Sequence, residues 1–296
     1  MNPILIGYLR LMRPANLPTA AADILAGVAL SSWFIGAGVS STSLFPILFL
    51  VIASVFLYAG GVVLNDVFDF EIDKVERPER ALPSGLISVR SAALFGAVLL
   101  SIGVVFAFCV TSLSGLIAIP LALAILAYDG FSKKYDFLGP LNMGLCRALN
   151  LLLGISIVSQ LPNWEYACIP LIYIFAITLI SRGEVHGDNK KHLVWAGFVY
   201  ASVIFIVVVM ALYRTDSVMQ TIPFLTLFAF LVFRPLVKAY HENSPMNIKK
   251  AVISGVLSVV VLDAAIASGH TVWWYAVLIL LLLPLSILLS KLFAVT

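Results

Sequence analysis

Charged residues are scarce in this sequence, and it has no long polar stretch. Only 11% of its 296 residues are Asp, Glu, Lys or Arg, whereas about a quarter of an ordinary soluble domain is charged. Hydrophobic residues make up 61% of the chain, and the mean hydropathy is +1.07. We therefore predict one integral-membrane domain over residues 1–296, with no separate soluble domain.

The number of cysteines and the net charge are also low. The first argues against a disulfide or zinc site, and the second argues against nucleic-acid binding. The three cysteines, Cys109, Cys146 and Cys168, fall inside apolar segments without metal-ligand spacing, which argues against a disulfide framework or a zinc site. The net charge is only +3, and the basic residues are dispersed over short loops. No nucleic-acid partner is therefore expected.

Apolar runs recur from end to end, and each is close to the roughly 20 residues that a helix needs to cross a bilayer. Strand-type alternation is absent, so the predicted fold class is an all-α, polytopic transmembrane helical bundle. We predict nine or ten spans, and the ten candidates are 16–36, 44–66, 90–110, 114–129, 139–160, 165–181, 193–213, 219–237, 249–268 and 271–291. The first span lacks an obvious cleavage site, so we expect it to be retained.

The basic residues predict the orientation of the bundle. With the N-terminus inside, 16 of the 18 Lys and Arg residues fall in cytoplasmic segments. The opposite face holds only Arg214, and Arg147 lies within a span. By the positive-inside rule both termini are cytoplasmic, and we expect the bacterial inner membrane.

Three aspartates at the end of the second span are the strongest chemical signal. Asp66, Asp69 and Asp73 are spaced i, i+3 and i+7, so they share one face of a helix, whereas Glu71 points elsewhere. Such charges need compensation at an apolar helix end, since an Asp nearer the bilayer centre costs about 2.5–3.5 kcal/mol. Magnesium suits such oxygens and commonly bridges carboxylates to phosphates. We predict a magnesium and diphosphate site here, with a solvated acidic helix end as the plainer alternative.

Basic residues on two neighbouring segments are candidate partners for a diphosphate. The loop 74–85 alternates prolines with Arg77 and Arg80, whose guanidinium groups can fork onto phosphate oxygens. It resembles a lid over an anion, although simple retention of positive charge inside is the alternative. After the fourth span, Lys133 and Lys134 offer point charges for phosphate, beside aromatic faces that can stabilise a carbocation.

The end of the sixth span repeats the acidic spacing imperfectly. Ser181, Glu184 and Asp188 again stand at i, i+3 and i+7, so the first carboxylate is missing. Arg182 and His186 add possible positive charge, and a bystander role is expected for the histidine. We expect this segment to converge with the first acidic motif on one ligand.

These motifs resemble the UbiA superfamily of intramembrane aromatic prenyltransferases, over nearly the whole chain. The family pattern NDxxDxxxD is matched at 65–73, and a loop like RPxRxLPSG follows at 77–85. Weaker matches are the stretch 13–16 and Tyr128 with the lysines after it. The departure at Ser181 and Glu184 from an aspartate-rich second motif suggests a subgroup, the UbiA-like EboC proteins of bacterial secondary-metabolism clusters.

The resemblance implies a central cavity that opens to lipid and a magnesium-dependent transfer of a prenyl group. An isoprenoid diphosphate would ionise to an allylic cation, which alkylates a hydrophobic or aromatic acceptor. The implied metal ligands are Asn65, Asp66, Asp69, Asp73, Glu184 and Asp188. The implied catalytic residues are Asp66, Asp69, Asp73, Lys133, Lys134, Glu184 and Asp188. The implied diphosphate-binding residues are Asn65, Arg77, Arg80, Lys133, Lys134 and Arg182.

Ionisable residues inside the predicted spans are candidates for the substrate pocket or for structural pairing. They are Asp23, Arg147 and Asp263, and we expect Arg147 to pair with one of the aspartates or to reach the site. The predicted acceptor or prenyl pocket comprises Asn16, Asp23, Tyr128 and Arg147.

Three other functions compete with prenyl transfer. A carrier that binds a prenyl diphosphate or a lipid precursor without turnover fits the altered second motif. A CDP-alcohol phosphotransferase would need a DGxxAR sequence before the carboxylates, whereas Asp129-Gly130 leads into Phe131-Ser132. An ion-coupled transporter would place its charges near the bilayer midplane rather than at one rim.

Overall fold

A computed structural model describes residues 2–36, 44–182, 190–215 and 218–293, and all regular structure in these ranges is helical. Within them, nine helical segments are long and apolar enough to cross a membrane. Six of them are single helices: α4 (Phe45–Phe68), α6 (Val89–Phe108), α7 (Ser112–Gly130), α10 (Lys190–Arg214), α11 (Val218–His241) and α12 (Pro245–His270). The other three contain α8 (Leu138–Ile155), α9 (Cys168–Ser181), and α13 (Trp273–Leu280) with α14 (Leu282–Leu292). The predicted helical membrane bundle is confirmed.

The first predicted span contains a shorter helix. α2 (Leu17–Leu30) has 14 residues, and the short helices α1 (Pro3–Leu11) and α3 (Trp33–Gly36) flank it. Fourteen residues rise only about 21 Å, which is less than the bilayer core. α2 packs on α4, α8 and α12, and all but two of its residues are buried. This explains why ten apolar segments are visible in the sequence while nine meet the length requirement.

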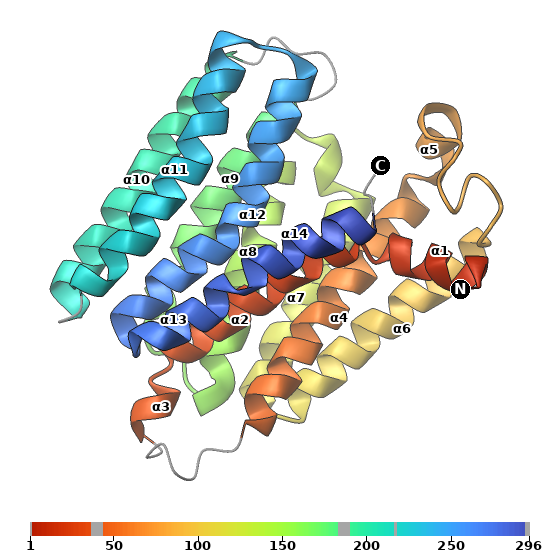
Figure 1. The fold of residues 1–296 in the computed structure, drawn as a ribbon. Helices are drawn as coiled ribbons and strands as arrows, with labels where there is room; N and C mark the ends of the chain where they lie inside the picture. Colours follow the sequence, from red (N-terminus) through yellow and green to blue (C-terminus); the bar gives the residue numbers. More distant parts are fainter. Residues whose placement is uncertain (1, 37–43, 183–189, 216–217, 294–296) are drawn as a thin grey trace.

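Successive long helices pack side by side, with α2 and α12 between the two outer groups (Figure 1). One group contains α4, α6 and α7, and the other contains α10 and α11. Because consecutive spans alternate in direction, the C-terminal ends of α4, α7 and α11 lie at the same end of the bundle. The first acidic motif is at this end, which we call the polar rim.

The crossing of α2 and α8 depends on two glycines that face each other. A Cβ atom on Gly27 would lie 2.5 Å from the Leu151 carbonyl oxygen, and one on Gly154 would lie 2.5 Å from the Ile24 carbonyl oxygen. These neighbours are backbone atoms, so they cannot move aside as a side chain can. Close approach through small residues is a common way to pack helices in membranes.

We expect Gly27→Ala to lower the free energy of unfolding by about 1–3 kcal/mol, the usual cost of overpacking. Gly197→Ala is the matched control, because its Cβ would meet only the Leu236 side chain at 3.5 Å. The control should be neutral or stabilising by up to about 1 kcal/mol, since alanine is the better helix former. Denaturant titration of both variants in the same detergent measures the difference, and equal stabilities would contradict this account of the crossing.

Candidate active site

The first acidic motif spans the junction of two helices. α4 ends at Phe68, α5 covers Phe70–Glu76, and Asp69 between them has φ −90° and ψ 3°. Helical hydrogen bonds continue through the junction, from Asp69 N to the Asn65 carbonyl (2.9 Å) and from Asp73 N to the Asp69 carbonyl (2.8 Å). The helix predicted here is divided at Asp69, but because these hydrogen bonds continue, the three carboxylates still follow one another on successive turns. Glu71 is exposed and pairs with Lys74 (2.9 Å).

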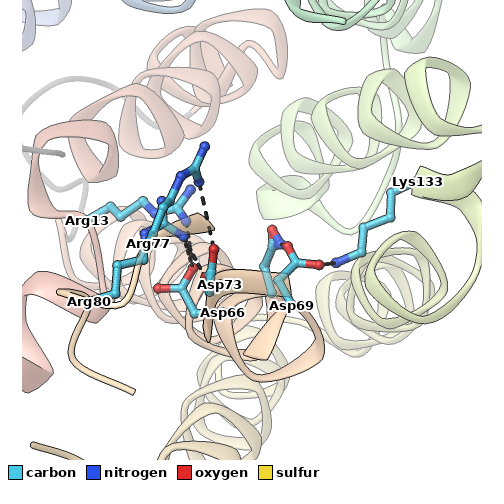
Figure 2. A network of polar contacts seen from close by, with 8 residues as sticks. Arg13, Asp66, Asp69, Asp73, Arg77, Arg80 and Lys133 are labelled. Atoms are coloured by element: carbon cyan, nitrogen blue, oxygen red, sulfur yellow. Dashed lines mark hydrogen bonds and ion pairs between the residues drawn. The ribbon is translucent and has the colours of Figure 1, made fainter. Parts of the chain in front are cut away.

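Arginines from two other segments compensate Asp66 and Asp73. Arg13 Nη2 lies 2.7 Å from Asp66 Oδ1, and Arg80 Nη1 lies 3.7 Å from the same oxygen. Arg80 also donates to Asp73 Oδ2 at 2.8 Å, and Arg77 approaches Asp73 to 4.0 Å. Figure 2 shows the three guanidinium groups on one side of these carboxylates. The predicted compensation of the acidic face by cations is confirmed, with Arg13 as a partner that the spacing could not identify.

Asp69 is contacted from the other side. Lys133 Nζ lies 2.6 Å from Asp69 Oδ1, and Asn65 Nδ2 donates to Asp69 Oδ2 at 2.8 Å (Figure 2). Lys133 belongs to a single 3₁₀ turn, Ser132–Lys134, that follows α7, and Lys134 at its end is exposed. The structure thus joins the first acidic motif to one of the two predicted lysines.

Given the diphosphate ligand that the sequence resemblance implies, Lys133→Gln should raise the KM for that ligand about tenfold, because about 1.4 kcal/mol of phosphate attraction corresponds to that factor. Lys134→Gln should change KM less than twofold, since an exposed side chain holds a diphosphate weakly. Initial rates over a range of concentrations of the prenyl diphosphate that the resemblance implies test the pair. A larger effect at Lys134 than at Lys133 would contradict the geometry.

The loop after α5 is anchored rather than free over the site. Leu82 and Ile87 are buried in a cluster with Leu11 and Val63, while Arg80 makes its two carboxylate contacts. Gly85 has φ +76°, a left-handed conformation that glycine adopts without a Cβ clash. The predicted arginine-bearing loop therefore lies beside the carboxylates in a defined position.

The end of the sixth predicted span is described only as far as Arg182. Its guanidinium group pairs with the Asp136 carboxylate and donates to the Tyr135 carbonyl at 2.6 Å, which ties α9 to the segment after α7. Ser181 Oγ donates to the Thr178 carbonyl of its own helix at 2.8 Å. Glu184, His186 and Asp188 lie outside the described residues, so their convergence with the first motif stays a prediction.

A cavity of about 170 Å³ extends from the polar rim into the bundle. Three helices each line it with one stripe of side chains, and α2 adds Ala20. The stripe on α4 is Ser54, Leu57, Tyr58, Gly61, Val62 and Asn65, that on α7 is Leu121, Ile125, Tyr128 and Asp129, and that on α8 is Met143, Cys146, Arg147 and Asn150. Arg13 also lines the cavity. From Asn65 to Ser54 the α4 stripe extends about 16 Å, so the cavity joins a charged rim to apolar walls.

A buried polar network forms the deep end of this cavity. Arg147 Nη1 donates to Asp23 Oδ2 (2.7 Å) and Nη2 donates to Thr19 Oγ1 (2.6 Å). Asn150 Nδ2 also donates to Asp23 Oδ2 (2.8 Å), and Ser54 Oγ donates to Asn150 Oδ1 (2.7 Å). The predicted pairing of Arg147 with an aspartate is confirmed, and the partner is Asp23. The Asp23–Arg147 ion pair therefore makes the deep end polar without adding a net charge to it.

The remaining predicted pocket residues differ in their access to the cavity. Tyr128 and Arg147 line it, whereas Asp23 is fully buried behind Arg147. Asn16 precedes α2 and is not a lining residue, and its carbonyl accepts a hydrogen bond from Thr19 Oγ1 (2.7 Å). Asp263 on α12 is buried as well, and it forms no ion pair with Arg147 among the described residues.

Tyr58 and Asp129 line the cavity but were not among the site residues predicted from the sequence. The Tyr58 ring centre lies 5.7 Å from the Arg147 guanidinium carbon, on the same stripe of α4 as Asn65. Asp129 lines the cavity next to Tyr128 and is buried. The spacing of seven residues between Tyr58 and Asn65, two helical turns, is a signal that could have identified the tyrosine.

A family model described as the UbiA prenyltransferase family matches residues 24–248 of the chain. The chain belongs to this family. The match extends from α2 into α12 and so includes the α4–α5 motif, the Lys133 turn and most of the cavity. This confirms the resemblance that the acidic motif and its following loop indicated.

Curated relatives of this UbiA family protein are digeranylgeranylglyceryl phosphate synthases. The one from Saccharolobus solfataricus is 33% identical over 193 residues, which cover 63% of this chain and 66% of the relative. The one from Methanococcoides burtonii is 39% identical over 150 residues, which cover 50% and 53% of the two chains. The matched region therefore spans just under two thirds of the first relative and about half of the second.

Solved structures confirm the UbiA fold. A structure of a digeranylgeranylglyceryl phosphate synthase has a TM-score of 0.66 at 22% identity, covering 91% of this chain and 99% of the other. A UbiA homologue from Archaeoglobus fulgidus bound to DMAPP and Mg²⁺ has a TM-score of 0.64 at 15% identity, covering 88% and 99%. At these identities the comparison concerns the fold alone.

Proposed function

We propose that this UbiA family protein transfers a prenyl group from an isoprenoid diphosphate to a hydrophobic acceptor within the membrane. The observation that carries the proposal is the polar rim, where carboxylates and cations from separate segments meet at the mouth of a cavity with apolar walls. The rim suits a diphosphate, and the walls suit the hydrocarbon chain attached to it. The curated relatives are named as synthases, which favours catalysis over a carrier.

The side chains of the rim fit magnesium by their chemistry. Asn65, Asp66, Asp69 and Asp73 present oxygen atoms on successive turns, and these residues would hold the ion. No three acidic, His or Cys side chains converge on one point within the described ranges. That incomplete set suits magnesium, which usually takes one or two carboxylates and completes its shell with water and substrate phosphates. When bound, magnesium supplies charge that stabilises a leaving diphosphate.

The basic residues of the rim would bind and stabilise the leaving group directly. Arg13, Arg80 and Lys133 lie within 4 Å of the carboxylates, so a diphosphate bound at these aspartates would also be within their reach. Arginine forks can donate two hydrogen bonds to phosphate oxygens, and lysine adds a point charge. Donors fixed before the reaction favour the charge that develops on the leaving oxygen.

The cavity walls would protect and stabilise an allylic cation. Leu57, Leu121 and Ile125 exclude water along the walls, so the prenyl cation meets the acceptor before water. The rings of Tyr58 and Tyr128 also line the cavity, and aromatic faces attract a cation. Transfer then breaks the bond from carbon to diphosphate oxygen and forms a bond from that carbon to the acceptor. The acceptor loses a proton in this step, which the released diphosphate can take up.

The acceptor that we propose is a membrane lipid precursor of the glycerol phosphate type. The names of the curated relatives favour this class over an aromatic acceptor. We also propose that the polar rim and both termini face the cytoplasm, because 16 of the 18 basic residues fall in segments at that side. The two relatives come from archaea, so the expectation of a bacterial inner membrane rests on the sequence resemblance alone.

Purified protein incubated with a panel of prenyl diphosphates and magnesium tests the function. We expect diphosphate release and a prenylated lipid with a glyceryl phosphate acceptor, and loss of both when magnesium is chelated. An aromatic acid in place of the lipid is the comparison that tests the acceptor class. Binding of the diphosphate without release, at any acceptor, would overturn the enzymatic proposal in favour of a carrier.

A further inference from the structure

A second hollow lies at the same end of the bundle, between α11 and α12. This groove has a volume of about 320 Å³. Its lining residues are Phe230, Leu231, Arg234, Pro235 and Lys238 on α11 and Asn247, Lys250 and Ser254 on α12. Figure 1 shows the α11–α12 hairpin apart from α4 and α5, so a groove lined by this hairpin lies apart from the carboxylates of the candidate active site.

The cations of this groove differ from those of the active site in having no acidic partner. Arg234, Lys238 and Lys250 form no ion pair within the described part of the chain, whereas Arg13, Arg80 and Lys133 each contact an aspartate. Among the described residues, these three cations make one cation–π contact, in which the Arg234 guanidinium carbon lies 5.5 Å from the centre of the Phe230 ring. Three uncompensated positive charges therefore face one hollow that no acidic side chain lines.

The neutral polar groups of the groove already have partners. Ser254 Oγ donates to the Leu231 carbonyl (2.8 Å). Asn247 Nδ2 donates to the Glu242 carbonyl (3.0 Å) and to the Glu242 carboxylate (3.1 Å), which does not line the groove and forms no ion pair with its cations among the described residues. The groups that remain for a ligand are therefore mainly the three cations. This favours an anion over a neutral molecule that binds through hydrogen bonds.

Charge and hydrophobicity are separated along the groove in the direction of the membrane normal. On α11, Lys238 is nearest the helix end, Arg234 is one turn deeper, and Phe230 is a further turn deeper. One turn rises about 5–6 Å, so on a helix that crosses a bilayer the cations lie nearer the membrane surface than the ring does. The ligand must therefore be anionic at one end and apolar at the other.

We propose that the α11–α12 groove binds an anionic phospholipid, with its phosphate among Arg234, Lys238 and Lys250 and an acyl chain along Phe230 and Leu231. Basic pockets between membrane helices are suited to such headgroups. The positive-inside rule accounts for basic residues at this face but not for the gathering of three of them around one hollow without an ion-pair partner among the described residues. Lys249 shows the difference, since it is exposed at the same depth on α12 but does not line the groove.

Native mass spectrometry of the purified protein with phosphatidylglycerol tests the proposal, and Lys249→Gln is the matched control for Lys250→Gln. We expect Lys250→Gln to weaken binding of one lipid about fivefold, because each basic residue near an anionic surface contributes about 1 kcal/mol. Lys238→Gln, an independent variant, should have the same effect, and Arg234→Gln with Lys250→Gln should weaken binding about 25-fold. The control should bind as tightly as the wild type.

Phosphatidylcholine and inorganic phosphate are the comparison ligands. The proposal is overturned if phosphatidylcholine binds as tightly as phosphatidylglycerol, or if Lys249→Gln and Lys250→Gln lose affinity equally. Displacement of the lipid by excess inorganic phosphate would show a site for free anions instead. Equal unfolding temperatures of all variants in phosphatidylcholine would show that a loss of binding reflects the groove and not a damaged fold.

Discussion

An Asp69→Asn variant is expected to transfer prenyl groups at least about 100-fold more slowly than the wild type. Asp69 lies at the junction of α4 and α5 and receives both Lys133 and Asn65. The amide removes the negative charge that a magnesium ion requires and replaces one of two oxygens with a donor. In the proposed mechanism the loss is larger than that from any single basic residue of the rim, because both the binding of the metal and the position of Lys133 would depend on this carboxylate.

Glu71→Gln is the matched control for this variant. The glutamate is two residues away, on α5, and loses the same charge when substituted. Its side chain is 79% exposed and pairs only with Lys74 among the described residues, so turnover should be unchanged. Rates measured against magnesium concentration distinguish the cases, since Asp69→Asn should also need more magnesium for half-maximal rate. Equal turnover by the two variants would remove the acidic motif from the mechanism.

Features set by local periodicity could be predicted from the sequence. The spacing of Asp66, Asp69 and Asp73 places them on successive turns whether or not the helix is continuous, because the backbone hydrogen bonds continue through Asp69. The apolar runs likewise predicted the spans, since burial in a bilayer depends mainly on the length and composition of each segment. The division of the helix at Asp69 was not predicted, because the sequence has no proline or glycine there that would indicate a helix end.

Contacts between distant segments could not be derived from the chain. Arg13 and Asp66 are 53 residues apart, and their meeting depends on how α1 and α2 approach α4. Lys133 and Lys134 are adjacent and chemically identical, and only the 3₁₀ turn after α7 determines which one contacts Asp69. Packing angles and turn geometry of this kind arise from the whole bundle and not from a local pattern.

The Asp23–Arg147 pair was predicted only in part from the sequence. The presence of ionisable residues inside apolar spans predicted a pairing, because an isolated charge there is costly. Two aspartates were possible partners, and the sequence could not choose between Asp23 and Asp263. The choice depends on the α2–α8 crossing, where Gly27 and Gly154 allow the two backbones to approach closely.

Arg147→Met is expected to lower the free energy of unfolding by about 3–5 kcal/mol, the range measured when one member of a buried ion pair is removed. Arg147 is 8% exposed and Asp23 is 0% exposed, so the aspartate would be left charged and without its main partner. Asn150 Nδ2 would still donate to Asp23, which compensates only part of the loss. The ion pair of the exposed Arg214 with the half-buried Glu165 (2.9 Å) provides the control, and Arg214→Gln should cost no more than about 1 kcal/mol.

The double variant Asp23→Asn with Arg147→Met separates the cost of an unpaired charge from the contribution of the pair. Removing both charges leaves no uncompensated ion, so the double variant should recover at least half of the stability that Arg147→Met loses. Denaturant titrations in one detergent give the four free energies of a double-mutant cycle. If the double variant were as unstable as the sum of the two single variants, Asp23 and Arg147 would act independently, and the neutral ion pair at the deep end of the cavity would have no energetic meaning.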